Sequence, residues 1–217
     1  MNWMQIEKMI FEFHIQIIGL RSPTVWRTVR LSGDCTFADF HVAIQYAFGW
    51  RNSHMFEFSE SGWGSTERIG QVDDEYCEED GPSDGRLSKI SDIFKQEGQS
   101  YVYIYDFGDN WEHAITLKKI GQGELRYPEC VAGGGQCPPE NIGSIPGYAS
   151  FKKILANPEN EEREEYVEWL IDGGYSVAGE WDPTEFDLKD TREFLFEVFQ
   201  GKEMGELDAW GRPTWML

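Results

Sequence analysis

Residues 105–113, Tyr-Asp-Phe-Gly-Asp-Asn-Trp-Glu-His, constrain the fold more than any other stretch of this sequence. They separate two apolar runs, 101–104 and 114–117, that are typical of short β-strands, and a Gly-Asp-Asn sequence lies between them. Two such runs joined by turn residues form a β-hairpin. Ionisable residues at the tip of a hairpin on a rigid sheet are well placed for function. The sequence therefore predicts a central hairpin that carries the candidate site.

The register of this hairpin follows from its turn. Asp109 and Asn110 tolerate the positive φ of a two-residue turn, and a turn there places Asp106 opposite His113. Every second residue of the returning strand then lies on the same face, which is the more apolar one: Trp111, His113, Ile115 and Leu117. An aspartate opposite a histidine can be a structural ion pair that ties two strands together. It can also be a general base, or a metal ligand, that the carboxylate orients. Structural pairs are the commoner origin of the pattern.

The same stretch offers a metal-binding alternative. Asp106, Asp109 and His113 could hold a divalent cation, with Glu112 or Cys130 as a further ligand, and a bound metal could activate water for hydrolysis. An aspartate at a turn is more often a turn residue than a ligand. No cofactor other than such a cation is expected.

The N-terminal part predicts a second hairpin and a helix. Residues 10–18 alternate apolar and polar side chains, and residues 25–31 form the returning strand. Thr36 and Asp39 have the spacing of a capping box, and Gly49 fits the end of a helix over 36–48 whose aromatic stripe packs on the sheet. Residues 54–58 predict a short strand at a sheet edge.

Two glycine-rich segments are expected to be loops. Residues 59–85 form an acidic insertion, in which residues 73–80 hold six acids without the spacing of a calcium loop. Residues 130–137 place three glycines between Cys130 and Cys137. The bare backbone N–H groups of such a loop could cradle an anion, but the loop lacks a P-loop ending, and a structural loop is preferred.

Helices complete the chain. The segment 146–201 contains three helical patterns, the last capped by Asp187, and residues 202–217 form a tail. The order of elements predicts a single α+β domain over 1–217, with a mixed or antiparallel sheet, an N-terminal hairpin, one packed helix, a central hairpin and C-terminal helices. The ββαβ order resembles a β-grasp arrangement, which is an analogy of fold only.

Charge and composition limit the partners. The 217 residues carry a net charge of -20, which repels phosphate backbones and disfavours nonspecific nucleic-acid binding, whereas a basic protein partner would be attracted. The four cysteines form no C-x-x-C pair, and no apolar run is long enough for a membrane span. Without an export signal at the N-terminus, the expected location is the cytoplasm. The sequence says nothing about oligomeric state.

Several motifs together resemble a known family. They are Pro23-Thr24-Val25-Trp26-Arg27, Phe48-Gly49-Trp50 with His54, residues 105–113, Cys130 with Pro138-Pro139-Glu140, Gly147-Tyr148, and Trp181-Asp182-Pro183 with Phe186-Asp187. The chain is similar to the plasmid Ri open-reading-frame-three-like family, prokaryotic proteins also described as passengers of insertion elements. The resemblance implies an α+β domain of undefined biochemical role. The family often has a basic residue before Pro138, where this chain has Gly135-Gln136-Cys137, which weakens the anion-binding idea.

Two hypotheses follow from these observations. The first is a cytoplasmic interaction module of a mobile or plasmid-borne element that binds a basic protein. Its candidate surface residues are Tyr105, Trp111, Glu112, Trp50, His54 and Trp181. The second is a metal-dependent hydrolase or nuclease built on Asp106, Asp109 and His113.

Overall fold

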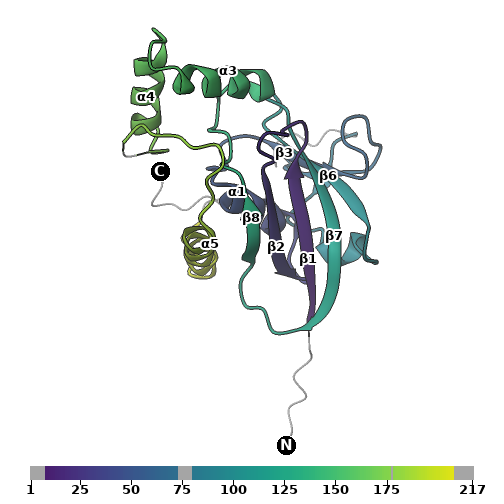
Figure 1. Cartoon of the computed structure of the whole chain (residues 1–217). Helices are drawn as coiled ribbons and strands as arrows, with labels where there is room; N and C mark the ends of the chain where they lie inside the picture. The colour runs from purple at the N-terminus through teal and green to yellow at the C-terminus, as the bar shows by residue number, and fades with distance from the viewer. Residues whose placement is uncertain (1–7, 73–79, 177, 208–217) are drawn as a thin grey trace, which may run out of the picture.

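The computed structural model describes residues 8–72, 80–176 and 178–207. Within them, an eight-stranded sheet has the order β5-β4-β3-β6-β7-β1-β2-β8 (Figure 1). Neighbouring strands are antiparallel except β4 and β5, which are parallel, so the sheet is mixed. The α+β class is confirmed. The strands are β1 (Lys8–Ile17), β2 (Trp26–Ser32), β3 (Phe56–Ser59), β4 (Arg68–Gly70), β5 (Ser83–Asp84), β6 (Ser100–Tyr105), β7 (Trp111–Gly123) and β8 (Glu129–Gly134).

The strand β1 lies inside the sheet, between β2 and β7. Its alternation is that of a half-buried strand, because Phe11, Phe13, Ile15 and Ile17 are all buried while the residues between them are partly exposed. The partner β7 alternates in the same way. Trp111, His113, Ile115 and Leu117 lie on the core face, as the sequence predicted. These two strands bring the N-terminal and central hairpins into one sheet.

The helix α1 (Phe37–Phe48) packs on this sheet and begins and ends as its sequence indicates. The Thr36 hydroxyl accepts a hydrogen bond from the Asp39 backbone N–H at 3.1 Å, and the Asp39 carboxylate accepts one from the Thr36 N–H at 2.8 Å. Gly49 ends the helix with φ of 87°, a left-handed conformation that favours glycine. Phe37 and Phe40 point into the core.

Replacing Thr36 by alanine is expected to lower the free energy of unfolding by about 1 kcal/mol, because the N–H of Asp39 loses its acceptor. Thr36→Ser keeps the hydroxyl and is the matched control. Chemical denaturation of both variants measures the difference. Equal loss of stability in the alanine and serine variants would contradict a capping role for the hydroxyl.

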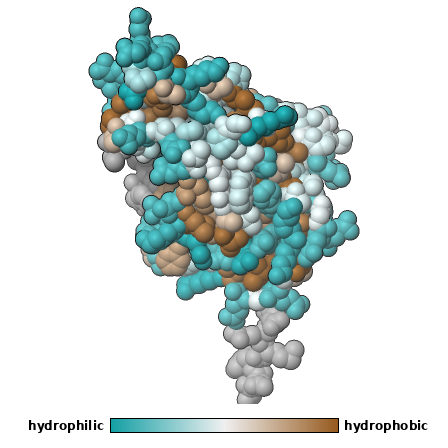
Figure 2. All heavy atoms as spheres, in the orientation of Figure 1, coloured by the Kyte–Doolittle hydropathy of each residue, from teal (hydrophilic) through white to brown (hydrophobic). Residues whose placement is uncertain are grey.

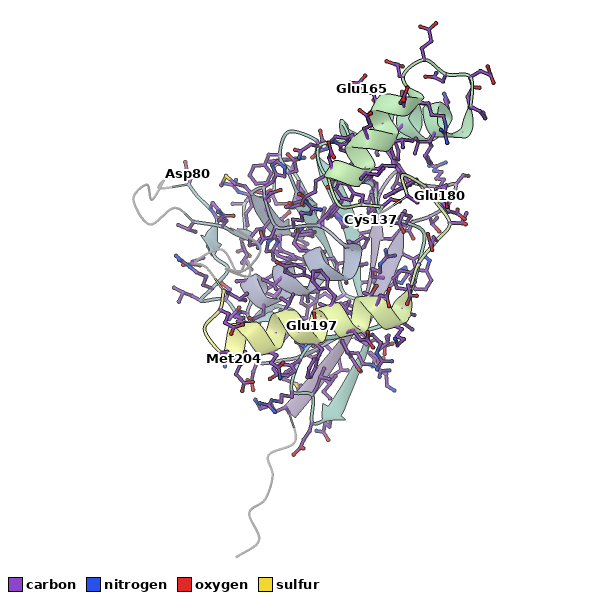
Figure 3. All side chains as sticks on the ribbon, turned by 90° about the vertical axis from the view of Figure 1, so that its left-hand side faces the viewer. Asp80, Cys137, Glu165, Glu180, Glu197 and Met204 are labelled. Carbon is purple, nitrogen blue, oxygen red and sulfur yellow. The ribbon has the colours of Figure 1, made fainter. Side chains whose placement is uncertain are left out.

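The remaining helices are α2 (Ile90–Ile93), α3 (Ser144–Ala156), α4 (Arg163–Asp172) and α5 (Leu188–Glu203). Asp187 caps α5 as predicted, accepting a hydrogen bond from the N–H of Asp190 at 3.0 Å. Figure 3 shows α5 lying across α1, and Leu195, Val198 and Phe199 bury its inner face. The helices α3 and α4 project from one end of the sheet, and Figure 2 shows that hydrophilic side chains cover this end. Tyr148, Phe151 and Leu170 nevertheless join the same buried cluster as the sheet.

Three local predictions are wrong. The strand predicted at an edge over 54–58 is β3, which lies between β4 and β6. The insertion 59–85 is not all loop, because β4 and β5 extend the sheet beyond β3. The glycine-rich loop after Cys130 begins as strand β8, in which Gly133 and Gly134 pair with Arg27 and Trp26. Residues 73–79 of the acidic run, Cys77, and Trp210 and Trp215 of the tail lie outside the described residues.

No helix within the described ranges is long and apolar enough to cross a membrane.

Candidate functional site

The turn of the central hairpin is longer than the sequence suggested. Tyr105 pairs with Trp111 and Tyr103 pairs with His113, so residues 106–110 form the loop. Asp106 and Asn110 both have φ of 55°, and the Asn110 N–H donates to the Asp106 carbonyl at 2.6 Å. The predicted two-residue turn is therefore wrong. Aspartate and asparagine both tolerate the left-handed region of backbone conformation. Residue types alone therefore could not show that Asp106 and Asn110 close the hairpin, rather than the adjacent pair Asp109 and Asn110.

Asp106 has a different histidine partner from the one predicted. Its Oδ1 accepts hydrogen bonds from the backbone N–H groups of Gly108 at 3.0 Å and Asp109 at 3.3 Å, which orders the turn. Its Oδ2 lies 3.5 Å from Nε2 of His54. The same nitrogen lies 3.0 Å from Oδ1 of Asn141. Asp106 and His54 thus connect the hairpin tip to the segment before β3.

His113 lies in the core rather than in a site. Its Nδ1–H donates to the carbonyl of Trp111 at 3.0 Å, and its ring meets the edges or faces of Phe48 and Trp50 at 5.2 Å between centroids. Within the described part of the chain, Nε2 is buried without a hydrogen-bond partner. Burial lowers the pKa of His113 to about 3. The predicted ion pair with Asp106 is wrong because the register differs by three residues, which turns Asp106 away from the face of His113.

The metal-ligand candidates do not converge. Oδ2 of Asp109 accepts a hydrogen bond from the N–H of Gly143 at 3.0 Å, which ties the hairpin tip to the start of α3. Cys130 belongs to β8, three strand positions from β7, or roughly 14 Å at the usual spacing. The described residues contain no group of three or more His, Cys, Asp or Glu side chains placed to hold a metal ion.

A buried carboxylate missed by the sequence analysis lies behind the hairpin. Oε1 of Glu140 accepts hydrogen bonds from the Tyr105 hydroxyl at 2.6 Å and the Arg51 N–H at 2.9 Å, and Oε2 accepts one from the Ser53 hydroxyl at 2.7 Å. Burial, followed by the charge of Glu140, raises the pKa of Tyr105 above its usual range, so the phenol keeps its proton. Glu140 thereby joins the loop after β8 to β6 and to the segment after α1.

A second buried network fixes the tautomer of His41. The Gln45 amide donates to the Tyr103 hydroxyl at 2.8 Å, and Nε2 of His41 lies 2.6 Å from Oδ1 of Asn52. Since Oδ1 only accepts, Nε2 carries the proton, and Nδ1 accepts from Tyr103 at 2.8 Å. Burial lowers the pKa of His41 to about 3, which keeps the ring neutral.

Most of the predicted surface aromatics are core residues. Trp50, Tyr105 and Trp111 are each 1% exposed, so they cannot form a binding surface. Trp181 is half-buried and packs edge-on against Phe151 at 5.5 Å between centroids. Glu112 and His54, the remaining candidates, are partly exposed. The burial of the first three follows from β6 and β7 lying inside the sheet, with α1 on one face.

Two other aromatic side chains stand at the surface of the hairpin tip. Trp63 is 48% exposed and Phe107 is 40% exposed, and their rings meet edge to face at 5.1 Å between centroids. The indole N–H of Trp63 donates to Oδ1 of Asn110 at 2.6 Å. A shallow cavity of about 470 Å³ adjoins Trp63 and includes Asp80 and Arg68 in its wall. These two exposed rings are therefore held in place instead of being free to rotate.

The sequence profile of the plasmid pRiA4b ORF-3-like proteins matches residues 9–190, which include every strand and most of the helices. The chain belongs to the plasmid pRiA4b ORF-3-like family.

Two relatives resemble this ORF-3-like chain over most of its length, one in sequence and one in sequence and fold. It is 35% identical over 170 residues to the uncharacterized protein y4hQ of Sinorhizobium fredii (strain NBRC 101917 / NGR234), covering 76% of this chain and 80% of y4hQ. It is also similar to the crystal structure of MM3350, a protein of unknown function from Methanosarcina mazei Go1. That likeness has a TM-score of 0.69 and 32% identity, and it covers 84% of this chain and 97% of MM3350.

Residues that carried the family resemblance meet in the buried networks of this ORF-3-like protein. Trp50 donates its indole N–H to the carbonyl of Pro138 at 2.9 Å, and Glu140 contacts Tyr105. These motifs are distant in sequence, and the folded chain joins them through hydrogen bonds. The Pro-Pro-Glu sequence was the signal in the chain that could have drawn attention to Glu140.

Proposed function

We propose that this protein is an interaction module that binds a basic protein or peptide at the tip of its central hairpin. The binding surface, here called the hairpin-tip patch, consists of Trp63, Phe107, Asp109, Asn110 and Glu112. The observation that carries the proposal is the pair of half-exposed aromatic rings, Trp63 and Phe107, fixed by each other and by Asn110. Exposed tryptophan that is already ordered loses little entropy on binding, which is typical of binding hot spots.

The charge around the patch supports a cationic partner. Glu112 accepts a hydrogen bond at 3.0 Å from the Asn110 amide whose oxygen holds Trp63, and Asp109 is the residue before Asn110 in the turn. Asp80 lines the cavity that adjoins Trp63, together with Arg68. A lysine or arginine side chain from a partner could stack on the indole while its charge meets these carboxylates. The net charge of -20 adds a long-range attraction that raises the rate of association. The wider role, as an accessory of a plasmid-borne element, rests on the family's name alone.

The alternative of a metal-dependent hydrolase or nuclease gains no support from the geometry. Asp106 contacts His54, Asp109 contacts Gly143, and His113 is enclosed in the core.

Trp63→Ala is expected to weaken binding of a basic partner by at least about tenfold, because hot-spot tryptophans each contribute about 2 kcal/mol or more. The protein, immobilised through its N-terminus, is used to capture proteins from a native lysate at low salt, and captured proteins are identified and then measured by calorimetry. Phe196→Ala is the matched control, since Phe196 is a half-exposed aromatic residue on α5 that packs on Tyr127, away from the hairpin.

Capture should weaken as salt rises, and the captured protein should be basic. Recovery of nothing but the protein itself at low salt would count against the interaction module. Equal capture by the wild type, Trp63→Ala and Phe196→Ala would instead show that a partner binds elsewhere.

A further inference from the structure

Arg27 is a buried cation whose charge no carboxylate in the described residues neutralises through an ion pair. Its side chain is 3% exposed, and Nε donates to the carbonyl of Ala47 at 2.7 Å. Nη1 donates to the carbonyls of Trp26 at 2.7 Å and of Gly134 and Gly135 at 3.1 Å each. These bonds tie β2, α1 and β8 together, and they use carbonyl groups alone. The positive charge itself is therefore left without a counter-ion.

The glycines near Arg27 do not form an anion cradle, which was the less favoured of the two interpretations of this loop. The idea of an anion cradle required their N–H groups, whereas Gly134 and Gly135 direct carbonyl groups at a cation. A Cβ at Gly133 would lie 2.5 Å from the ring of Phe186 and 2.9 Å from Cδ of Arg27. The absence of side chains here is what lets Phe186 approach the guanidinium, whose centre lies 4.1 Å from that ring.

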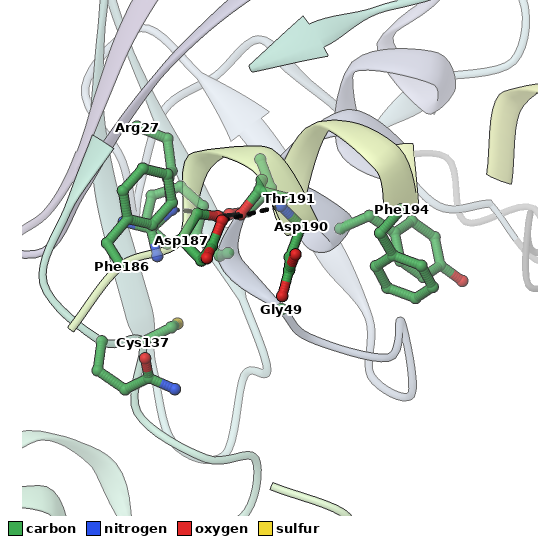
Figure 4. A pocket seen from close by; sticks show the side chains of 12 residues that line it. Arg27, Gly49, Cys137, Phe186, Asp187, Asp190, Thr191 and Phe194 are labelled. Carbon is green, nitrogen blue, oxygen red and sulfur yellow. Dashed lines mark hydrogen bonds between the residues drawn. The ribbon is translucent and has the colours of Figure 1, made fainter. Parts of the chain in front are cut away.

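The second terminal nitrogen of Arg27 makes no hydrogen bond within the described residues, and it is not fully enclosed by protein atoms. Arg27 lines a cavity of about 300 Å³ between α1 and the start of α5 (Figure 4). Phe48, Phe186 and Phe194 supply its apolar wall. The volume is at the lower end of the range for small-molecule pockets. The second terminal nitrogen is therefore the donor of this buried cation that remains open to a ligand in the cavity.

The thiols near Arg27 do not supply the missing negative charge. Burial raises the pKa of Cys130 to about 11 and raises that of Cys137 further, so both remain neutral at ordinary pH. The N-terminus of α5 adds the partial positive charge of its dipole on the same side. The inner part of the cavity therefore favours an anion.

The outer part of the cavity disfavours an anion that carries more than one negative charge. Asp187 and Asp190, both exposed, line the same cavity. Oδ1 of Asp187 is engaged as the cap of α5, while no partner is recorded within the described chain for the carboxylate of Asp190. A dianion entering past these carboxylates is repelled more than a monoanion, and an amine on the ligand would be attracted.

We propose that this cavity binds a small monocarboxylate with an apolar body, the carboxylate accepting a hydrogen bond from the free terminal nitrogen of Arg27. The apolar part of the ligand packs between Phe186 and Phe194. The site is independent of the hairpin-tip patch, because it is formed by β2, α1, the segment after β8 and α5. A free carboxylic acid and an amino acid share the chemistry that Arg27 recognises, and the presence of an amine distinguishes them.

Four probes with the same aromatic body test the charge preference: 3-phenylpropionate, L-phenylalanine, phenethylamine and phenyl phosphate. Each is titrated into the full chain while the Nε–H resonance of Arg27 and the amide of Thr191 are followed by NMR. We expect 3-phenylpropionate or L-phenylalanine to shift both resonances with a saturable dissociation constant, and phenyl phosphate to bind at least about fivefold more weakly. Tighter binding of phenylalanine than of phenylpropionate would assign the natural ligand to the amino acids.

Two substitutions separate binding from folding. Arg27→Lys keeps a charge, but a single ammonium cannot bond the carbonyl groups of α1 and β8 and also reach the ligand as the branched guanidinium does, and it should weaken carboxylate binding at least about tenfold. Because Arg27 also holds three elements together, that variant can fail to fold. The surface variant Asp190→Asn then tests the proposal without disturbing the fold. It is expected to raise the affinity for phenyl phosphate about fivefold. Glu197→Gln is its control, since it removes one charge from the same helix away from the cavity (Figure 3).

No shift of the Arg27 or Thr191 resonances with any carboxylate at 5 mM (about a -3 kcal/mol limit on affinity) would overturn the proposal. So would phenyl phosphate binding as tightly as 3-phenylpropionate, or identical phosphate affinities in Asp190→Asn and Glu197→Gln.

Discussion

Lowering the pH from 7.5 to 5 is expected to lower the free energy of unfolding by about 4 kcal/mol, through the buried histidines His41 and His113. Burial lowers the pKa of each ring to about 3 in the folded protein, whereas the unfolded value is near 6.5. Each histidine would contribute about 2 kcal/mol of this loss at pH 5.

The direction follows from which state binds the proton. Between pH 6.5 and 3 the unfolded chain is protonated at these rings and the folded chain is not, so stability falls as pH falls. The stabilisation is fully present above pH 6.5 and is lost progressively down to the folded pKa of about 3. Measurements between pH 7.5 and 5 stay above the range in which ordinary carboxylates titrate.

Guanidinium denaturation at several pH values measures this slope. His113→Phe places an apolar ring among Phe48 and Trp50, and it should reduce the proton uptake on unfolding from about two to about one near pH 5. Loss of the hydrogen bond to Trp111 lowers the stability of this variant by a similar amount at every pH, so it is not the cause of the change in slope. An unchanged slope in His113→Phe would show that the ring is already protonated in the folded state.

Glu140→Ala is expected to destabilise the fold by about 3–5 kcal/mol. Hydrogen bonds to a charged group contribute about 1.5–3 kcal/mol each, and the carboxylate accepts them from Tyr105, Arg51 and Ser53. Its removal leaves the Tyr105 hydroxyl without its acceptor in a buried position. Thermal and chemical unfolding measure the loss.

The controls for Glu140 separate charge from hydrogen bonding. Glu159→Ala removes an exposed acid and should alter stability by less than about 0.5 kcal/mol. In a double-mutant cycle with Tyr105→Phe, the two losses should fall short of additivity by about 1 kcal/mol or more, because the same hydrogen bond is removed twice. Additive losses would mean that Tyr105 and Glu140 act separately.

Local patterns in the sequence predicted the long strands β1 and β7 and the starts of two helices, but they missed the short strands β4, β5 and β8. The period-two alternation of β1 and β7 identified their buried faces, and the Thr36–Asp39 pair and Asp187 marked the starts of α1 and α5. These signals depend on neighbours within a few residues, so they survive without knowledge of the rest of the chain.

The candidate site depended on contacts that no local pattern contains. His113 lies near Asp106 in sequence, yet the five-residue turn shifts the register of the hairpin. As a result His113 lies in the core, and the carboxylate of Asp106 contacts His54 instead. A single change of turn length reverses which face a side chain occupies, so the register could not be fixed from residue types alone.

The α+β class, the buried faces of β1 and β7 and the starts of α1 and α5 follow from the sequence alone, because backbone preference and hydrophobic periodicity act locally. Contacts between distant segments extend the sheet beyond β3 with β4 and β5, surround Arg27 with carbonyls from β2, α1 and the β8 segment, and bring Glu140 to Tyr105. Because it is buried, Arg27 places a positive charge in the wall of a cavity, and Glu140 forms a structural hydrogen-bond network. Both effects depend on which distant segments exclude water from these residues.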